Sequence, residues 1–379
     1  MKADRCDISG HTPSAPRERP VSDGHSALTS AREDPHVRIG LILTSGSVKG
    51  DVEQAVRAEA VGFDGVYSIE FFNRHGYVPL GAVAQATRRV RIGTAIANAF
   101  TRSPLLHASA AMDLDELSDG RMVLGLGSAT RRMNEDWYGV PFPAPAPRMR
   151  ELVELLRAAF AAQKGGGFRW DGAHWKLSVP IYARPGAPRV DIPIWIAAVN
   201  RGMIATAGAV ADGLVGHPIA TRRWHREVTL PGLRAAESAA GREAGACALA
   251  PYVMTSIQPE REDAVRDAKC QIGFYFTTSL YHSILDLHGL RAIGEACRAA
   301  LRKFDVQAMA DAVPDSLVDE IAIACTPDEA KQRLAQWKGL TDQPLLYAPS
   351  VGVPPARLRA NLDAMLDVFG DSARGERRE

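Results

Sequence analysis

The sequence has little of what marks several large classes of protein. Its five cysteines are scattered and form no CxxC pair, which argues against a zinc site and against a disulfide framework. No apolar run reaches the length of a membrane-spanning helix. The formal net charge is only +1, so there is no excess of one sign of the kind that binds nucleic acid or a membrane surface. We therefore expect a protein of the reducing cytoplasm, without a metal, a nucleic-acid partner or a membrane partner.

The first 36 residues also lack the apolar core of a secretory signal. They are rich in Ser, Pro, Arg, Asp and His, which predicts a disordered N-terminal extension at 1–36. The alternative is an arm that folds over a neighbouring subunit. No GxGxxG motif follows an expected strand, so a Rossmann-type NAD site is not expected. The overall content of 46% hydrophobic and 23% charged residues is typical of a globular protein.

From Val37 onward the chain alternates apolar strands with helical segments. The predicted strands are 38–43, 65–69, 90–97, 122–126, 192–197, 213–216, 248–257 and 344–348. The predicted helices between them are 51–61, 77–87, 104–117, 147–162, 202–210, 222–241 and 260–273. Eight strands that alternate with helices predict an α/β fold, a (β/α)8 TIM barrel at 37–370, followed by a C-terminal tail at 371–379.

Two segments are too long for a simple strand–helix rhythm. In residues 164–191 polar and apolar residues alternate, and glycines occur where turns are expected, which predicts a hairpin. Residues 274–324 form a second, mostly helical insertion, ahead of a helix that begins near Thr326. The second insertion starts with aromatic and hydroxyl-bearing side chains. This composition favours a cap over the mouth of the barrel, and the alternative is a cover on its outside.

The stretch 117–128 combines a helix end, a tight turn, a short buried strand and a glycine-rich strand exit. Asp119 and Gly120 supply the turn. Gly125 and Gly127 remove side chains where the strand ends, which lets another group approach the backbone. In a β/α barrel this exit lies on the catalytic face. The alternative is that both glycines serve packing alone.

Seven motifs then follow in one order: Glu70 after the second strand, and the segments 93–98, 115–127, 139–142, 148–151, 207–213 and 274–281. In this order they resemble the luciferase-like flavin monooxygenase superfamily, especially its branch that uses the deazaflavin coenzyme F420. The resemblance covers about 37–369 and implies a (β/α)8 barrel, in agreement with the strand count. It also implies a flavin-type ring in the mouth, a homodimer, and a non-proline cis peptide bond among residues 95–98.

The resemblance places the cofactor ring against the ends of the first strands and its phosphate near the fifth and sixth strands. A helix N-terminus at Arg201 and Gly202 would attract the phosphate, although relatives often carry a Gly-Pro-Lys turn there. A solvated surface charge is the alternative for either arginine of this region. The expected cofactor-binding residues are Thr44, Glu70, Ala97, Asn98, Gly127, Ser128, Val199, Asn200, Arg201, Gly202, Met203, His217, Thr221 and Arg222.

The candidate acid–base residues are Glu70, His75 and His217. Relatives often have an acid–His pair after the second strand, whereas this chain has Glu70 followed by Phe71. Glu70 is interpreted either as a proton donor with a raised pKa or as a structural carboxylate that bonds the neighbouring strand. Each histidine is alternatively structural. Phe71, Tyr275 and Tyr281 are expected in the substrate pocket, and the alternative for the tyrosines is the core.

These observations lead to an expected oxidoreductase that uses coenzyme F420 for hydride transfer to or from a small organic substrate. The first alternative is a two-component monooxygenase that uses reduced FMN supplied by a separate flavin reductase. The alternative of another class is a catalytically silent barrel that binds flavin or has a structural role.

Overall fold

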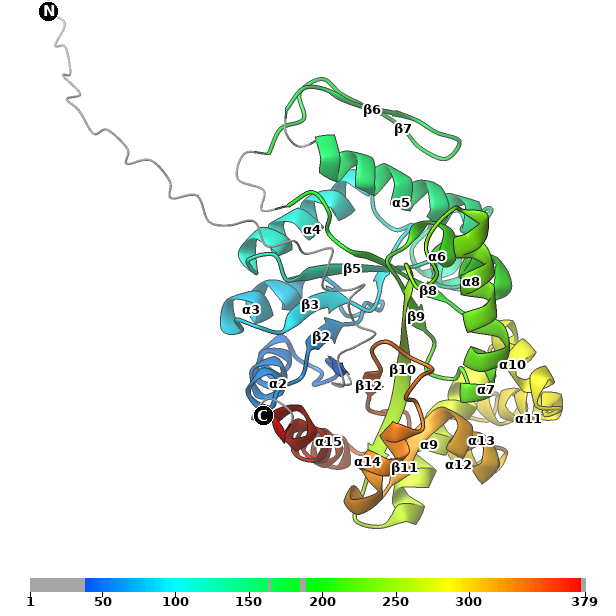
Figure 1. Cartoon of the computed structure of the whole chain (residues 1–379). Coiled ribbons are helices and arrows are strands. Elements are labelled where there is room, and N and C mark those ends of the chain that lie inside the picture. Colours follow the sequence, from blue (N-terminus) through cyan, green and yellow to red (C-terminus); the bar gives the residue numbers. More distant parts are fainter. Residues whose placement is uncertain (1–37, 163–164, 185–188, 376–379) are drawn as a thin grey trace, which may run out of the picture.

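The computed structural model describes residues 38–162, 165–184 and 189–375. Its centre is a closed barrel of eight parallel strands, with β9 paired to β10 and β12 paired to β1 (Figure 1). The strands of the ring are β1 (Gly40–Ile42), β2 (Gly65–Ser68), β3 (Arg91–Thr94), β5 (Met122–Gly127), β8 (Ile194–Ala198), β9 (Gly213–Gly216), β10 (Ala248–Ile257) and β12 (Leu345–Tyr347). The predicted fold is therefore confirmed. The predicted extension at 1–36 and the last part of the tail lie outside the described residues.

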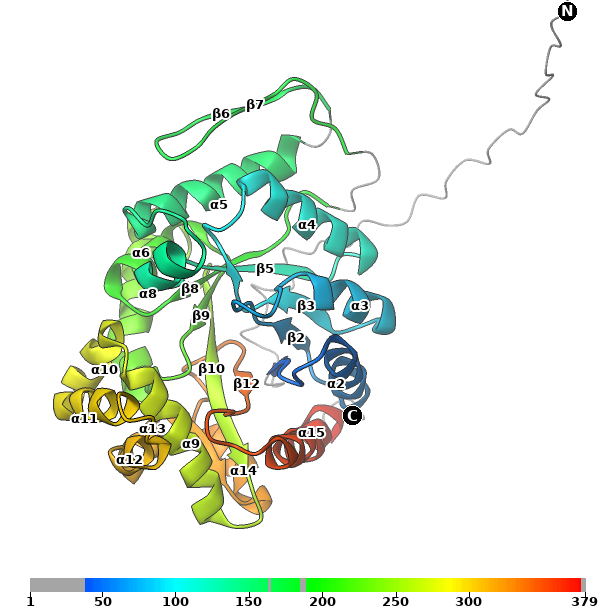
Figure 2. The ribbon, with the colours of Figure 1, turned by 180° about the vertical axis from the view of Figure 1, so that it is seen from behind.

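Helices surround the barrel on all sides (Figure 2). They are α2 (Val48–Val61), α3 (Val78–Ala86), α4 (Pro104–Leu117), α5 (Pro145–Ala162), α6 (Arg201–Val210), α7 (Arg222–Trp224), α8 (Leu230–Ala239), α9 (Arg261–Phe276), α14 (Pro327–Ala335) and α15 (Pro355–Gly375). Local chemistry sets their ends. In α2, the Ser47 side chain accepts the Gly50 amide, and Gly62 closes the helix with φ 99°.

The interior of the barrel is closed by two large rings, those of Tyr67 and Trp195. The rings stack with centroids 5.5 Å apart, and both residues are almost fully buried. They fit because the strands around them carry glycine wherever a Cβ would collide with one of the two rings, at Gly40, Gly65, Gly93 and Gly213. The barrel is therefore a packed core and not a pore, and ligands can enter only at its mouth.

The first insertion is a hairpin, as predicted. Strands β6 (Phe168–Asp171) and β7 (Lys176–Val179) pair antiparallel and lie over the outer side of α5 (Figure 1). Glu151 of α5 attaches the hairpin, because its carboxylate accepts the Trp170 indole N–H and the amides of His174 and Trp175.

The second insertion departs from the expectation in two ways. Its helices α11 (Arg291–Leu301), α12 (Val306–Asp311) and α13 (Asp315–Ile321) pack on α9 beside the barrel. The part before them, up to His288, contacts the segments that follow β8 and β9. Its end is not helical, because β11 (Ala322–Cys325) extends the sheet along the second half of β10. The sequence analysis missed β11 because Ile321 passes directly into Ala322 without the Gly or Pro that normally marks a boundary.

No helix in the described ranges is both long and apolar enough to cross a membrane.

Candidate active site

The mouth of the barrel is built by the residues that follow the carboxyl ends of the strands. Its floor is apolar, with Ile69, Ile96 and Ala197 lying on top of the core inside the barrel. In the closed ring, β2 and β9 are separated by three strands on either side. The loops after these two strands therefore face each other across the mouth. They carry Glu70 and His217, each of which is the centre of a cluster.

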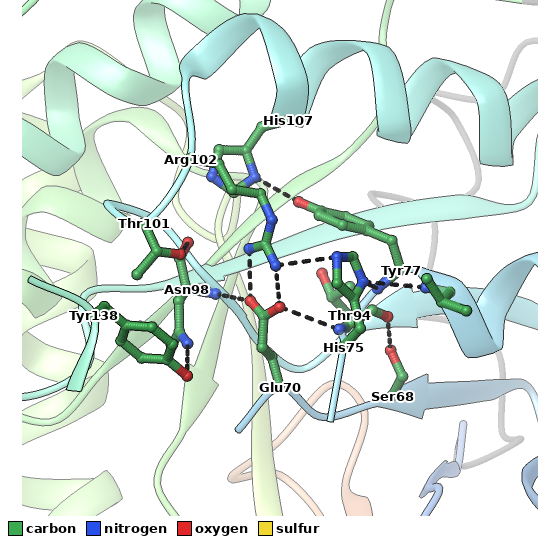
Figure 3. A network of polar contacts seen from close by, with 12 residues as sticks. Ser68, Glu70, His75, Tyr77, Thr94, Asn98, Thr101, Arg102, His107 and Tyr138 are labelled. Atoms are coloured by element: carbon green, nitrogen blue, oxygen red, sulfur yellow. Dashed lines mark hydrogen bonds and ion pairs between the residues drawn. The ribbon is translucent and has the colours of Figure 1, made fainter. Parts of the chain in front are cut away.

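Glu70 binds four N–H groups at once (Figure 3). Its carboxylate accepts bonds from both terminal nitrogens of Arg102, one of them at 2.7 Å. It also accepts the backbone amides of Asn98 at 2.7 Å and of Gly76 at 3.3 Å. The side chain of Glu70 is 4% exposed and that of Arg102 is 19% exposed. One carboxylate thus connects the end of β2 to the short strand β4 (Ala97–Asn98), to the segment after it, and to the loop at 71–76.

This geometry corrects the raised pKa expected of Glu70. Burial alone would raise the pKa of this carboxyl, but the bonds from Arg102 and from the Asn98 and Gly76 amides outweigh burial and hold the pKa below its ordinary value. The carboxyl is therefore ionised at neutral pH and has no proton to give. Of the two interpretations left open by the sequence, the geometry favours the structural carboxylate.

Arg102 is the residue that the sequence analysis missed. An arginine in a loop is usually a solvated charge, so Arg102 carried no signal by itself. The available signal was indirect: a carboxylate held at the end of a buried strand needs a cation within reach, and Arg102 follows the next strand along the chain.

Two histidines lie beside this pair. His75 is exposed, and its Nδ1 accepts the Tyr77 amide at 3.1 Å. His107 is buried, with Nδ1 2.6 Å from the Tyr77 hydroxyl and Nε2 3.2 Å from the carbonyl oxygen of Ala99. Burial lowers the pKa of His107 to about 4, so this imidazole is neutral and structural. His75 stays a candidate for proton transfer.

The wall that follows β3 has the predicted backbone feature, because the peptide bond Ala95–Ile96 is cis. Hydrogen bonds hold this wall from two sides. The Tyr252 hydroxyl donates to the carbonyl oxygen of Ala95 from across the barrel, and the Asn98 amide group donates to the Tyr138 hydroxyl at 3.1 Å. The wall expected to support a cofactor ring is therefore fixed before any ligand binds.

Gly125 and Gly127 make room for the chain itself. A Cβ at Gly125 would lie 1.9 Å from the carbonyl oxygen of Thr94, and a Cβ at Gly127 would lie 2.6 Å from the Ile96 side chain. This finding favours the packing alternative for both glycines. Gly127 supports the Ile96 floor, and its expected contact with the cofactor stays a prediction.

The second cluster surrounds His217 at the end of β9. Its ring packs against Tyr281 at 4.3 Å between centroids and against Tyr275 at 4.8 Å. The two tyrosines come from the start of the second insertion, which is the only part of it that caps the mouth within the described chain. Burial lowers the pKa of His217 to about 3, which disfavours the acid–base interpretation of this residue at neutral pH.

Helix α6 begins beside this cluster. Its N-cap Asn200 makes no capping bond with its side chain, which instead contacts Leu280 and Ser283. The Met203 amide donates to the carbonyl oxygen of Asn200, which leaves the amides of Arg201 and Gly202 for another acceptor. A Cβ at Gly202 would meet nothing within 4 Å, and within the described chain the Arg201 guanidinium makes no hydrogen bond or ion pair. The predicted phosphate site at 200–203 is sterically open and remains a prediction.

Two residues expected at the phosphate are used elsewhere. The Thr221 hydroxyl accepts the Trp224 amide at 2.9 Å and contacts His288 at the same distance. The Arg222 guanidinium bonds Gln336 and lies 3.4 Å from Glu320. Both side chains therefore stabilise the region of α7, which disfavours their expected role at the phosphate.

The remaining candidates lie at the rim. Phe71 forms an exposed aromatic cluster with Phe72 and Trp137, with ring centroids 4.7 and 5.5 Å from that of Phe71. The Thr44 hydroxyl just after β1 is buried and has no hydrogen-bond partner among the residues that the structure describes. Ser128, Val199 and Met203 are partly buried at the ends of their elements.

Comparison with known proteins places this site in a family. Residues 28–343 match the family model of the luciferase-like monooxygenases. Over 309 residues, the chain is 32% identical to the uncharacterised protein Rv1360 of Mycobacterium tuberculosis. This alignment covers 79% of this chain and 90% of that protein. It is 30% identical over 284 residues to the 5,10-methylenetetrahydromethanopterin reductase of Archaeoglobus fulgidus. This alignment covers 73% of this chain and 82% of the reductase.

Among solved structures, the coenzyme F420-dependent tetrahydromethanopterin reductase of Methanopyrus kandleri superposes with a TM-score of 0.71 at 22% identity. The superposition covers 89% of this chain and 98% of that one, which shows the shared fold. The matched family model spans most of the barrel and both clusters of the mouth. The chain therefore belongs to the luciferase-like monooxygenase family and is an oxidoreductase.

Proposed function

We propose that the protein is a coenzyme F420-dependent oxidoreductase that transfers hydride to or from a small organic substrate. The observation that carries the proposal is the similarity to the Archaeoglobus fulgidus reductase, which extends over nearly three quarters of the chain. The Methanopyrus kandleri reductase, whose structure has the same fold as this chain, is a coenzyme F420-dependent enzyme.

The residues of the mouth fit a deazaflavin. A flat, largely apolar ring suits the floor formed by Ile69, Ile96 and Ala197. The uncapped start of α6 suits a phosphate, because its amides and the helix dipole both favour an anion and Gly202 leaves the approach open. When bound, the deazaflavin supplies the hydride chemistry.

The residues of the chain hold and shape the site. The pair of Glu70 and Arg102 fixes the wall of β4 and the loop at 71–76, so the ring meets a preformed surface. The aromatic residues around His217 form the opposite wall. His75 remains the group at the mouth that can carry a proton to solvent, since it is exposed and adjacent to Arg102.

The second candidate function is an FMN-dependent monooxygenase with a flavin reductase partner. The description of the matching family as monooxygenases favours it. The same floor and the same α6 terminus suit the ring and phosphate of FMN. A homodimer is part of either proposal, and light scattering of the purified protein measures it.

Turnover separates these functions. The protein is mixed without oxygen with reduced coenzyme F420 and a panel of small aldehydes, ketones and enones, and the return of the oxidised cofactor is followed by absorbance. We expect oxidation with at least one class of compound. Oxygen consumption with reduced FMN and a reductase, without any oxidation of reduced coenzyme F420, would instead support the monooxygenase. Cofactor binding without either reaction would support a silent barrel.

A further inference from the structure

We infer that His217 is a permanently uncharged hydrogen-bond donor that binds a neutral acceptor oxygen of the substrate, so that the substrate class is a carbonyl compound or the alcohol formed from it. The inference deepens the proposed function and rests on it for the reaction. It assigns His217 a role other than proton transfer.

The hydrogen bonding of the ring fixes where its proton lies. Nδ1 of His217 accepts the backbone amide of Ile219 at 3.4 Å. A neutral imidazole whose Nδ1 accepts must carry its hydrogen on Nε2. Within the described chain Nε2 has no hydrogen-bond partner, although it is not sealed in the core. The residue therefore presents one N–H group that a ligand can use.

The surroundings of the ring keep it uncharged. The titratable groups packed against it are Tyr275 of α9 and Tyr281 of the turn Ser279–Tyr281. Burial raises the pKa of Tyr281 to about 12 and that of Tyr275 well above its ordinary value, so both phenols are neutral too. Burial lowers the pKa of His217 to about 3, without a carboxylate to offset it. The imidazole stays neutral at every pH at which the protein is expected to work.

An uncharged donor between phenol rings selects an uncharged acceptor. A carboxylate or phosphate bound by His217 would lose hydration, and neither the neutral imidazole nor the two phenols carries a positive charge to offset this cost. A carbonyl oxygen loses less and gains one hydrogen bond. His217 follows β9, and β5 and β8 separate this strand from β3, which leads into the wall at 95–98. A substrate between the wall and the histidine can meet the cofactor with one side and His217 with its oxygen.

The role is electrostatic. When a carbonyl carbon accepts hydride from the reduced deazaflavin, the π pair of the C=O bond moves to the oxygen, which then takes a proton from water. The Nε2–H group stabilises the negative charge as it develops on this oxygen and keeps its own proton. The reverse reaction uses the same contact with the alkoxide of an alcohol.

The first test needs no cofactor. Protein labelled with ¹⁵N in histidine is titrated from pH 5 to pH 8 by NMR, and the His217 signals are identified by their loss in His217→Phe. The inference expects a neutral ring protonated on Nε2 throughout, without a titration step. A ring that protonates near its ordinary pKa, or that carries its hydrogen on Nδ1, overturns the inference even if the protein proves to use coenzyme F420.

The second test compares variants in the turnover assay. His217→Gln keeps an N–H donor, whereas His217→Phe keeps only a ring without a donor, so the pair of variants separates the hydrogen bond from the packing of the ring. We expect His217→Phe to lose about 10²–10³-fold in kcat with carbonyl substrates, as for the loss of one oxyanion donor, and His217→Gln to recover most of it. The binding constant for oxidised coenzyme F420 is measured for both variants, and kcat is compared at saturating cofactor, so that a change in cofactor affinity is not mistaken for loss of the hydrogen bond to the substrate. Wild-type kcat in His217→Phe, or no recovery in His217→Gln with the fold intact, overturns the inference.

Discussion

The ion pair of Glu70 and Arg102 should be the strongest single tie at the mouth of the barrel. With side chains 4% and 19% exposed, the pair is shielded enough that removing one partner leaves a charge poorly compensated. Breaking a fully buried pair costs roughly 3–5 kcal/mol, and the partial exposure of Arg102 reduces the expected loss to about 2–3 kcal/mol. For a chain of this length the unfolding entropy is about 0.8 kcal/mol/K, so Tm should fall by about 2.5–4 °C.

A double-mutant cycle measures the interaction free energy between Glu70 and Arg102 separately from the contribution that each residue makes alone. Glu70→Gln, Arg102→Met and the double variant are unfolded in urea and by calorimetry. We expect a coupling free energy of about 2 kcal/mol, since the partners share several hydrogen bonds. The exposed pair of Arg57 and Asp363, with side chains 50% and 52% exposed, is the control. It should couple by less than about 1 kcal/mol.

The cycle also separates a structural carboxylate from a general acid. A coupling below about 0.5 kcal/mol would refute the reasoning about Glu70, because independent sites add to within that margin. An unchanged Tm in Glu70→Gln together with a loss of kcat would show that the carboxyl acts in proton transfer. Because the pKa of Glu70 is lowered in the folded state, the stabilisation should be present above the unfolded pKa and be lost as the pH falls through the folded pKa.

Three further predictions concern single residues. Gly202→Val should weaken the binding of coenzyme F420 by about tenfold or more in fluorescence titrations. Gly81→Val, which also lies at an open position in a helix, is the control and should leave the affinity unchanged. Equal affinities of the two variants would show that the phosphate does not bind at Gly202. Gly125→Ala should lower soluble yield and Tm far more than Gly127→Ala, because the first collides with backbone and the second with a flexible side chain. Burial lowers the pKa of His225 in the folded state to about 4, so the unfolded chain binds this proton first as the pH falls. Protonation of His225 should therefore lower the unfolding free energy by about 2 kcal/mol between neutral pH and pH 5, as measured by urea titrations. A His225→Leu variant with the same dependence of unfolding free energy on pH would contradict this.

The barrel could be predicted from the sequence because each of its strands is an apolar run followed by a helix with its own start and stop signals. The helix at 104–117 was predicted with the bounds observed, since Pro104 opens it and the turn at 118–120 ends it. Strand β11 could not be predicted, because its partner is the far half of β10 and no residue near Ala322 signals the change from helix to strand. Periodicity describes local patterns, while pairing partners depend on the whole fold.

The site shows the same division. Residue types placed Glu70 and His217 correctly at the mouth, because both follow strands of the barrel. Their charge states could not be predicted, since they depend on groups distant in sequence: Arg102 lies 32 residues from Glu70 and lowers its pKa. Likewise, Arg222 has the charge expected of a phosphate ligand, but its guanidinium bonds Gln336 and forms an ion pair with Glu320, and both partners are distant in sequence.

The central claim is that the mouth of this barrel holds a deazaflavin. The most direct measurement is a pair of equilibrium titrations, in which the purified protein is titrated with oxidised coenzyme F420 and with FMN and binding is followed by fluorescence quenching. The account predicts that coenzyme F420 binds at least about tenfold more tightly than FMN, a difference of about 1.4 kcal/mol. Tighter binding of FMN, or no binding of either, would contradict it.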